Sequence, residues 1–362
     1  MPRDRPSSLA RFLLVAYVLL VVYATLYPFA GWRDAGGSAF AYLSAAWPRY
    51  FTHFDVAANV LAYLPYGALA VLAMHPVARG GVAVSAALIS GAALTVLLEG
   101  AQSYLPARVA SNLDVLCNLA GTLAGALLGV RHADWLFDTG PLQRLRAAWV
   151  LPGAQADAGL VLLGLWLLTQ LDPTSLLFGA GDLRDLFQHP AGAAYAADVF
   201  VTIEAWTAAC NLIAVGLAAS AILAPGVARR LPLLALLALA LAVKTAAFVI
   251  LRQANGVFDW LTPGALIGLA VGTPLLLAAA GLPRALRLAL AALLLMGATV
   301  LVNLAPPNPY LVNMLKVWSQ GHFLNFNGLT HLLSSAWPFA AIVYLMFLAA
   351  RGTGARPGKM PP

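Results

Sequence analysis

Ten runs of about 20 mostly apolar residues follow one another along this chain of 362 residues. A helix needs about 20 such residues to cross the hydrocarbon core of a bilayer. Only 10% of the residues are charged, against about 25% in soluble domains. The sequence therefore predicts an all-α, polytopic integral membrane helix bundle of about ten transmembrane helices, at residues 9–29, 56–74, 82–101, 113–130, 159–178, 199–224, 231–251, 262–280, 284–304 and 331–350.

The basic residues predict the direction of the spans. Fourteen of the 21 lie in segments on the side of both termini, six lie on the other side, and Lys244 lies inside a span. Because loops rich in Lys and Arg stay inside the cell, both termini are expected in the cytoplasm. The basic residues flank apolar runs and form no stripe, so no nucleic-acid partner is expected. No small-residue cleavage site follows the first run, which indicates a span and not a removed signal peptide.

Three regions are expected along the chain. Residues 1–130 contain four predicted spans, and residues 159–362 contain six. Between them, residues 131–158 are mixed in charge and rich in Gly and Pro, which is typical of a linker, here on the cytoplasmic side. A shift of 145 positions places Asp259 on Asp114 and Lys244 on Glu99, so the six-helix region is interpreted as a degenerate copy of the first half.

The scarce polar residues of the first half gather near three predicted helix ends. Residues three or four apart share a face of a helix, and such spacings relate Glu99 to Gln102, Asp114 to Asn118, and Asp55 to Asn59. We expect these three helix ends to converge, with the loop residue Arg108, at one external opening. The predicted ligand-binding residues are Asp55, Asn59, Glu99, Gln102, Arg108, Asp114 and Asn118.

The same polar residues carry a resemblance to a family. The pattern Glu99-x-x-Gln102, Arg108, Asp114-x-x-x-Asn118-x-x-Gly121-x-x-x-Gly125 resembles the VanZ-like family of membrane proteins. "HFDVAANVLAYLPYGALA" and "YATLYPF" are also similar to segments of that family, and the resemblance covers about residues 9–130. The family often has a further Asp where this chain has Ser111, which argues against a two-carboxylate site in that loop.

The resemblance implies a multi-pass protein of the bacterial cytoplasmic membrane, linked to the cell envelope and to low-level resistance to the glycopeptide antibiotic teicoplanin. It supplies no biochemical activity. Gly121, Gly125 and Gly129 are interpreted from their spacing alone, because small residues at every fourth position let two membrane helices approach closely.

Two further expectations concern charge and metal chemistry. Glu204 and Lys244 have opposite charges in neighbouring spans, and a buried ion pair would offset their cost in the membrane; a proton or ion relay is the alternative. Cys117 and Cys210 lie inside apolar runs and predict neither a disulfide nor a metal site. His322 and His331 are too far apart along one helix for a local metal pair, so no metal or other cofactor is expected.

Three classes of function remain open on the sequence alone. The first is binding or modification of a lipid-linked or amphiphilic ligand, such as an envelope precursor or a lipoglycopeptide, with Arg108 on an anionic head group. The second is a secondary transporter or flippase of envelope lipids, which needs a site between repeats near the bilayer midplane. The third, less favoured, is an intramembrane enzyme, for which His53 is the nearest candidate general base.

Overall fold

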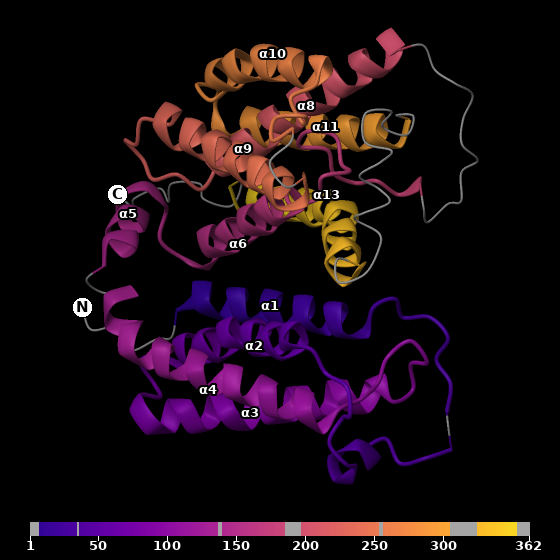
Figure 1. The fold of residues 1–362 in the computed structure, drawn as a ribbon. Coiled ribbons are helices and arrows are strands. Elements are labelled where there is room, and N and C mark those ends of the chain that lie inside the picture. Colours follow the sequence, from indigo (N-terminus) through magenta and orange to yellow (C-terminus); the bar gives the residue numbers. More distant parts are fainter. Residues whose placement is uncertain are drawn as a thin grey trace, which may run out of the picture. The chain divides into compact units, whose positions relative to one another are not determined.

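In the computed structural model the chain folds into two compact units, Met1–Ala147 and Ala148–Pro362 (Figure 1). The structure describes residues 7–34, 36–136, 140–184, 197–252, 256–304 and 324–352. Regular structure in these residues is helical, apart from one isolated β-bridge between Val150 and Leu223. The prediction of an all-α, polytopic membrane bundle is confirmed.

The helices follow the predicted apolar runs closely. Each of the ten runs contains a helix, and eight helices of the described residues are long and apolar enough to cross a membrane. The remaining two, Ala154–Thr169 and Pro263–Ala279, are apolar but shorter. These two occupy the fifth and eighth predicted spans.

The first unit is built from four long helices that lie side by side (Figure 1). Three of them begin at a side-chain cap, where an oxygen accepts from backbone N–H groups that have no partner within the helix. Ser7 caps α1, Thr52 caps α2 and Ser111 caps α4. The helices are α1 (Ser8–Leu26), α2 (His53–Met74), α3 (Gly80–Gln102) and α4 (Asn112–Asp134), with the short 3-10 helix η1 (Ala41–Ser44) in the α1–α2 connection.

Helices α2 and α4 pack backbone against backbone. A Cβ atom at Gly125 would overlap the carbonyl oxygen of Leu64, and one at Gly121 would overlap that of Val60. At Gly129 a Cβ would lie 3.0 Å from the carbonyl oxygen of Ala68. The three glycines therefore form the strip of α4 on which α2 lies, and this contact brings the polar starts of both helices together.

The segment predicted as a linker, 131–158, is partly helical. Helix α4 continues to Asp134, the short helix α5 (Pro141–Trp149) has no buried residue, and α6 begins at Ala154.

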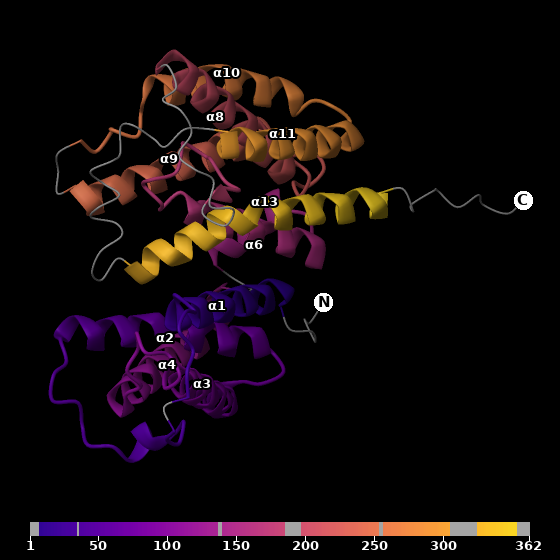
Figure 2. The same cartoon turned by 90° about the vertical axis from the view of Figure 1, so that its right-hand side faces the viewer.

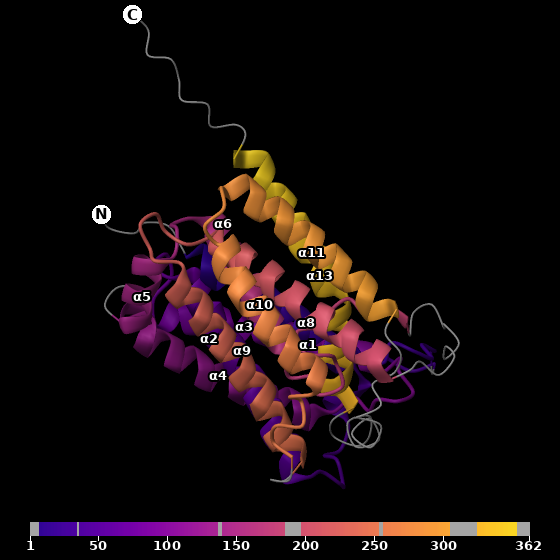
Figure 3. The same cartoon turned by 90° about the horizontal axis from the view of Figure 1, so that it is seen from above.

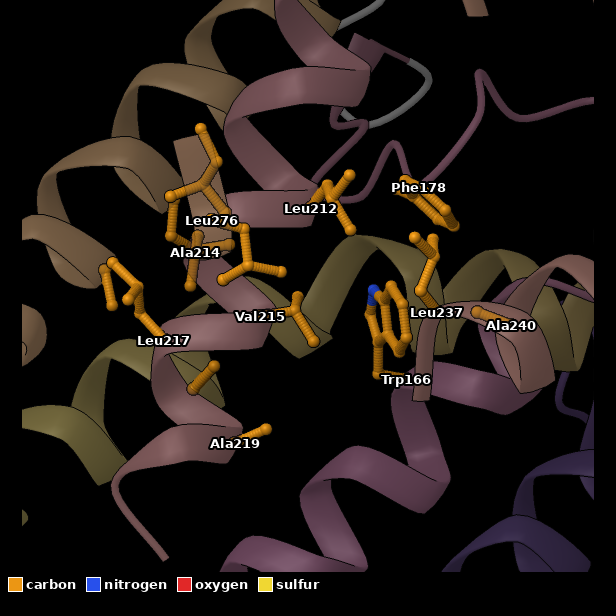
Figure 4. Close-up of a cluster of buried hydrophobic side chains, with 14 of the residues drawn as sticks. Trp166, Phe178, Leu212, Ala214, Val215, Leu217, Ala219, Leu237, Ala240 and Leu276 are labelled. Carbon is orange, nitrogen blue, oxygen red and sulfur yellow. The ribbon is translucent and has the colours of Figure 1, made fainter. Parts of the chain in front are cut away.

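The second unit is organised around α8, whose span is the most buried of the eight long ones. Helix α8 contacts α10, α11, α6 and α9, and Figure 3 shows α11 and α13, which are also in contact, running side by side. In the core, Trp166 lies next to Phe178, with ring centroids 5.5 Å apart, among leucines of α8 and α9 (Figure 4). The helices, seen from a second side in Figure 2, are α6 (Ala154–Thr169), α8 (Ala197–Ser220), α9 (Arg230–Arg252), α10 (Pro263–Ala279), α11 (Arg284–Leu304) and α13 (Leu324–Gly352).

The predicted fifth span, 159–178, is wrong at its C-terminal end. Helix α6 ends at Thr169, and the chain continues to residue 183 without regular structure. Pro173 explains the break, because the residue before a proline is disfavoured in the α conformation. Asp172 then closes a local turn: its Oδ1 accepts from the backbone N–H of Thr174 at 2.9 Å and from the Thr174 hydroxyl at 2.6 Å.

This irregular segment is nevertheless buried from Leu176 to Gly181. Backbone polar groups away from water need partners, and side chains of two helices supply them. Asn303 of α11 donates to the carbonyl of Gly181 at 2.7 Å and accepts from the N–H of Leu183 at 2.9 Å. The hydroxyl of Ser335 on α13 donates to the carbonyl of Asp182 at 2.7 Å.

The end of this segment gives a pH-dependent prediction. Burial alone would raise the pKa of Asp182, but hydrogen bonds from Arg184 and its positive charge lower it overall, with Nε of Arg184 2.9 Å from Oδ1. A lowered pKa means that the stabilisation is present above the unfolded value of about 3.9 and is lost as the pH falls through the folded value. We expect Asp182→Asn to lower stability at neutral pH by about 1 kcal/mol, because the pair is partly exposed.

The measurement is the unfolding midpoint of the purified protein as a function of pH. The difference between wild type and Asp182→Asn should shrink below about pH 4. The exposed loop residue Asp34 provides a control, since Asp34→Asn should change little at any pH. A wild-type to Asp182→Asn difference that persists unchanged in acid would contradict the pairing.

Candidate functional site

A hydrogen bond joins the starts of α2 and α4. The Asn59 amide Nδ2 donates to Oδ1 of Asp114 at 2.8 Å, and both side chains are half-buried. Both residues lie within the first two turns of their helices, next to the glycine contact between α2 and α4. The four-residue spacing that relates Asp55 to Asn59 and Asp114 to Asn118 therefore does bring two of these polar residues together.

Glu99 lies in the last turn of the neighbouring helix, α3, and is buried, with 4% of its surface exposed. Its Oε2 accepts from the backbone N–H of Ser111 at 2.9 Å, the residue whose own hydroxyl caps α4. A carboxylate at the start of a helix is favoured by the unpaired N–H groups and the helix dipole there. Glu99 also lies within electrostatic range of Tyr42 in η1. The pKa of the Tyr42 hydroxyl is raised, first by burial and then by the charge of Glu99.

One turn deeper, Asn118 links α4 to α3. Its Nδ2 donates to the hydroxyl of Thr95 at 2.8 Å, and both side chains are buried. The Asn118 Oδ1 atom is buried and has no hydrogen-bond partner in the structure. We call Asn59, Thr95, Glu99, Ser111, Asp114 and Asn118 the polar cluster.

Gln102 and Arg108 contact a different helix. The amide of Gln102 donates to the carbonyl of Thr25 at 3.0 Å. The guanidinium of Arg108 donates to the carbonyl of Tyr27 at 2.6 and 3.1 Å and to that of Ala24 at 3.4 Å. The last carbonyls of a helix have no partner within it, so both side chains cap the end of α1 and attach it to the α3–α4 loop.

Asp55 lies at the outer edge of the cluster. Its Oδ2 accepts from the backbone N–H of Thr52 at 3.0 Å and from the Thr52 hydroxyl at 2.7 Å, while the Thr52 hydroxyl oxygen is 3.1 Å from the Asp55 N–H. This reciprocal arrangement is a capping box, and both residues are exposed. Asp55 therefore fixes the start of α2.

Three acidic side chains interact through their charges at this end of the unit. Asp55 lies within electrostatic range of Asp114, and Asp114 within range of Glu99. They run from exposed through half-buried to buried. Since like charges in a partly dehydrated site repel one another, the cluster favours a proton, an ammonium group or neutral hydrogen-bond donors as its occupant.

The predicted site residues did not include two members of the cluster, Ser111 and Thr95, or the neighbouring cap Thr52. Ser111 opens the pattern S-N-L-D and Thr52 the pattern T-H-F-D, and a Ser or Thr three residues before an acid is a signature of a helix start. That signature could have identified both caps. Thr95 has no such signal, because a single threonine in an apolar run usually bonds within its own helix.

A comparison with known protein families finds a match to this part of the chain. Residues 13–133 match the family model VanZ/LLP1. The first unit contains a VanZ-like domain. Together with the eight helices long and apolar enough to cross a membrane, the match indicates a multi-pass membrane protein with a VanZ-like domain at residues 13–133, and the sequence resemblance is confirmed. Neither a curated protein nor a solved structure matches the chain.

Outside the VanZ-like domain, the predicted direct ion pair in the second unit needs correction. Lys244 is 1% exposed, and its ammonium donates to the carbonyl oxygens of Asp172 at 2.6 Å and Ser175 at 3.1 Å and to the Ser175 hydroxyl at 3.2 Å. Glu204 is 2% exposed and lies within range of this charge, but it makes no ion pair with Lys244 among the described residues. The carbonyl groups of the turn at Pro173 accept hydrogen bonds from the Lys244 ammonium in place of the carboxylate of Glu204. His322 lies outside the described residues.

Proposed function

We propose that the VanZ-like domain binds the polar head of a lipid-linked or amphiphilic molecule of the bacterial cell envelope at the polar cluster. The observation that supports this most is the pair of carboxylates in α3 and α4. Glu99 and Asp114 are fixed by Ser111 and Asn59, two uncharged groups, and they leave the end of the bundle acidic. An amphiphile whose head carries ammonium or hydroxyl groups would complement that charge, and its tail would lie between helices or in lipid.

The proposal assigns different tasks to the predicted ligand-binding residues. Glu99 and Asp114 contact the head group, and Asn59 and Asn118 orient hydrogen bonds around them. Gln102 and Arg108 hold α1 against the α3–α4 loop, and Asp55 fixes the start of α2. Arg108 was expected on an anionic head group; its guanidinium donates to carbonyls of α1, so we propose a positioning role for it.

The proposed location follows from the distribution of basic residues. With both termini in the cytoplasm of a bacterium, the polar cluster faces the outer side of the cytoplasmic membrane, where lipid-linked envelope precursors are exposed to glycopeptide antibiotics. The link to teicoplanin resistance belongs to the same proposal, since this antibiotic carries a fatty chain and is itself an amphiphile.

Carboxylate replacement tests the proposal. We expect Glu99→Gln and Asp114→Asn each to weaken binding of fluorescently labelled teicoplanin to the purified protein in lipid nanodiscs by about tenfold, the loss of one charged hydrogen bond of about 1.4 kcal/mol. Cells that express either variant should become more susceptible to teicoplanin than cells that express the wild type.

The chain offers two matched controls. Glu204→Gln changes the other glutamate of the sequence, in the second unit, and Arg49→Ala changes an exposed loop residue; both should leave binding unchanged. Native mass spectrometry of the purified protein should also show co-purified lipid that is lost in Glu99→Gln. Unchanged antibiotic binding, lipid content and susceptibility in both carboxylate variants would overturn the proposal.

Transport of an envelope lipid is the second candidate function, and one observation favours it. Irregular backbone at membrane depth is tolerated where it is buried in protein or lines a water-filled cavity, and transporters use broken helices of this kind around their sites. The short helix α6, followed by the irregular segment 170–183 that is buried from Leu176 to Gly181, has this arrangement. Water inside the second unit would support transport over binding alone.

A further inference from the structure

The second unit contains buried polar atoms that its fold does not pair. Buried side-chain polar groups in proteins nearly always have a partner, either protein or water. Six side-chain atoms in the described part of this unit have none: Trp166 Nε1, Gln170 Oε1, Glu204 Oε2, Thr207 Oγ1, Asn211 Oδ1 and Trp260 Nε1. An unpaired buried group costs about 1–3 kcal/mol, so six of them require a compensating partner.

Three of the six lie on one face of the central helix. Glu204, Thr207 and Asn211 of α8 are three and four residues apart, and they are 2%, 0% and 1% exposed. We call these three residues the α8 file. At a rise of 1.5 Å per residue, the α8 file begins about 10 Å from the start of α8 and extends along the helix for about another 10 Å. The Glu204 carboxylate and the Asn211 carbonyl oxygen need donors, and the Thr207 hydroxyl can donate or accept.

The α8 file ends at Asn211. Val215, one turn further along the same face, is 2% exposed and apolar. The amide Nδ2 of Asn211 is already bonded to the carbonyl of Thr207 at 3.2 Å, which leaves its Oδ1 directed elsewhere. The polar part of this face is thus confined to the half of α8 that starts at Ala197.

The charges around Glu204 do not balance. Lys244 on α9 is held by the carbonyls of the 172–175 turn, and Asp172 exerts the larger attraction on it, followed by Glu204. One cation is therefore shared between two buried carboxylates. Helix α10 contributes no charged side chain, and Arg287 of α11 binds Ser220 at the far end of α8.

The Glu204 carboxylate packs against the start of α10. A Cβ atom at Gly264 of α10 would overlap Oε2 of Glu204, and the Thr262 side chain and the Gly264 backbone N–H lie within hydrogen-bonding range of the carboxylate group. The Thr262 hydroxyl oxygen accepts from the N–H of Ala265 at 3.2 Å as the cap of α10. Glycine at position 264 thus leaves room for the carboxylate at the entrance of the α8 file.

We propose that α8 borders a water-filled site inside the second unit, in which Glu204 binds and releases a proton. Water donates to the oxygens of Glu204 and Asn211 and forms a hydrogen bond with the Thr207 hydroxyl. The Glu204 carboxylate takes one proton from hydronium, leaving water, and returns that proton to water on release, so no other reactant is needed. Protonation removes the excess negative charge that Lys244 does not offset.

Thiol accessibility tests the water. In a Cys117→Ala/Cys210→Ala background, reconstituted in lipid nanodiscs, Thr207→Cys should react with methanethiosulfonate ethylammonium, a small hydrophilic reagent. Val215→Cys, equally buried on the same face, should remain unlabelled over the same time. Labelling of neither variant, with the fold intact by circular dichroism, would show that the α8 face is dry and overturn the proposal.

Infrared difference spectroscopy on the full-length protein tests the proton. The carbonyl band of protonated Glu204, identified by its loss in Glu204→Gln, should appear as the pH is lowered and should shift on exchange into D2O. Thr207→Val keeps the shape of the side chain but removes the hydroxyl, and it should slow that exchange without removing the band. A band that never appears, or one that does not shift in D2O, overturns the proposal.

Discussion

Replacing Gly125 by alanine should strongly destabilise the VanZ-like domain. The added Cβ would overlap the carbonyl oxygen of Leu64 and lie 3.0 Å from the backbone nitrogen of Ala68. Overpacking usually costs about 1–3 kcal/mol because side chains can shift. Here both sides of the contact are backbone, so the helices themselves must separate, and we expect a loss of about 3 kcal/mol.

The glycines of this chain provide a graded series for the measurement. At Gly129 the nearest atom to a new Cβ is 3.0 Å away, and at Gly297 of α11 there is none within 4 Å. Gly129→Ala should therefore cost less than Gly125→Ala. Gly297→Ala should be neutral or slightly stabilising, by up to about 1 kcal/mol, since alanine favours the helix. Unfolding of the purified protein in increasing dodecyl sulfate, followed by circular dichroism, gives the three values.

The test is the order of the three changes in the free energy of unfolding. If Gly125→Ala behaved like Gly297→Ala, α2 and α4 would not be in backbone contact. In that case the hydrogen bond between Asn59 and Asp114 would also lose its basis. A second check is Gly67→Ala on α2, which would overlap the carbonyl oxygen of Thr122 and should reproduce the loss from the other side of the interface.

The helices could be predicted because length and hydropathy alone decide whether a segment can span a membrane. The run predicted at 231–251 became Arg230–Arg252, and that at 284–304 became Arg284–Leu304. The exception is the run 159–178, where Asp172 and Pro173 interrupt the helix while the segment stays buried. Hydropathy reports burial and not conformation, so a buried irregular segment and a helix look alike until the proline is considered.

The candidate site could be predicted as a set of positions but not as a set of bonds. Spacing predicted that Asn59 and Asp114 lie near helix ends, and the structure joins the two side chains by a hydrogen bond. It could not show that Arg108 donates to carbonyls at the end of α1, because backbone acceptors have no sequence signature. For the same reason the opposite charges of Glu204 and Lys244 predicted a direct pair, whereas the ammonium binds carbonyls of a turn.

Removing the ammonium of Lys244 should have the largest effect in the second unit. Lys244→Met keeps most of the length and volume of the side chain but leaves the carbonyls of Asp172 and Ser175, which it reaches at 2.6 and 3.1 Å, without that donor. It also removes the cation that interacts with the buried charge of Asp172. Breaking a buried charged contact on one side costs about 3–5 kcal/mol, and we expect a loss in this range.

Leu239→Met is the matched control, because it introduces the same side chain on the same helix at a position that is 50% exposed. Its free energy of unfolding should stay within about 0.5 kcal/mol of the wild-type value.

Limited proteolysis separates a local effect from a global one. If Lys244 holds the 172–175 turn, Lys244→Met should open a cleavage site between residues 170 and 184 before the helices unfold, and Asn303→Ala should do the same from the other end of the segment. A Lys244→Met protein as stable and as protease-resistant as Leu239→Met would mean that the turn is held by its own Asp172–Thr174 hydrogen bonds, and that the lysine is free to serve the carboxylate of Glu204.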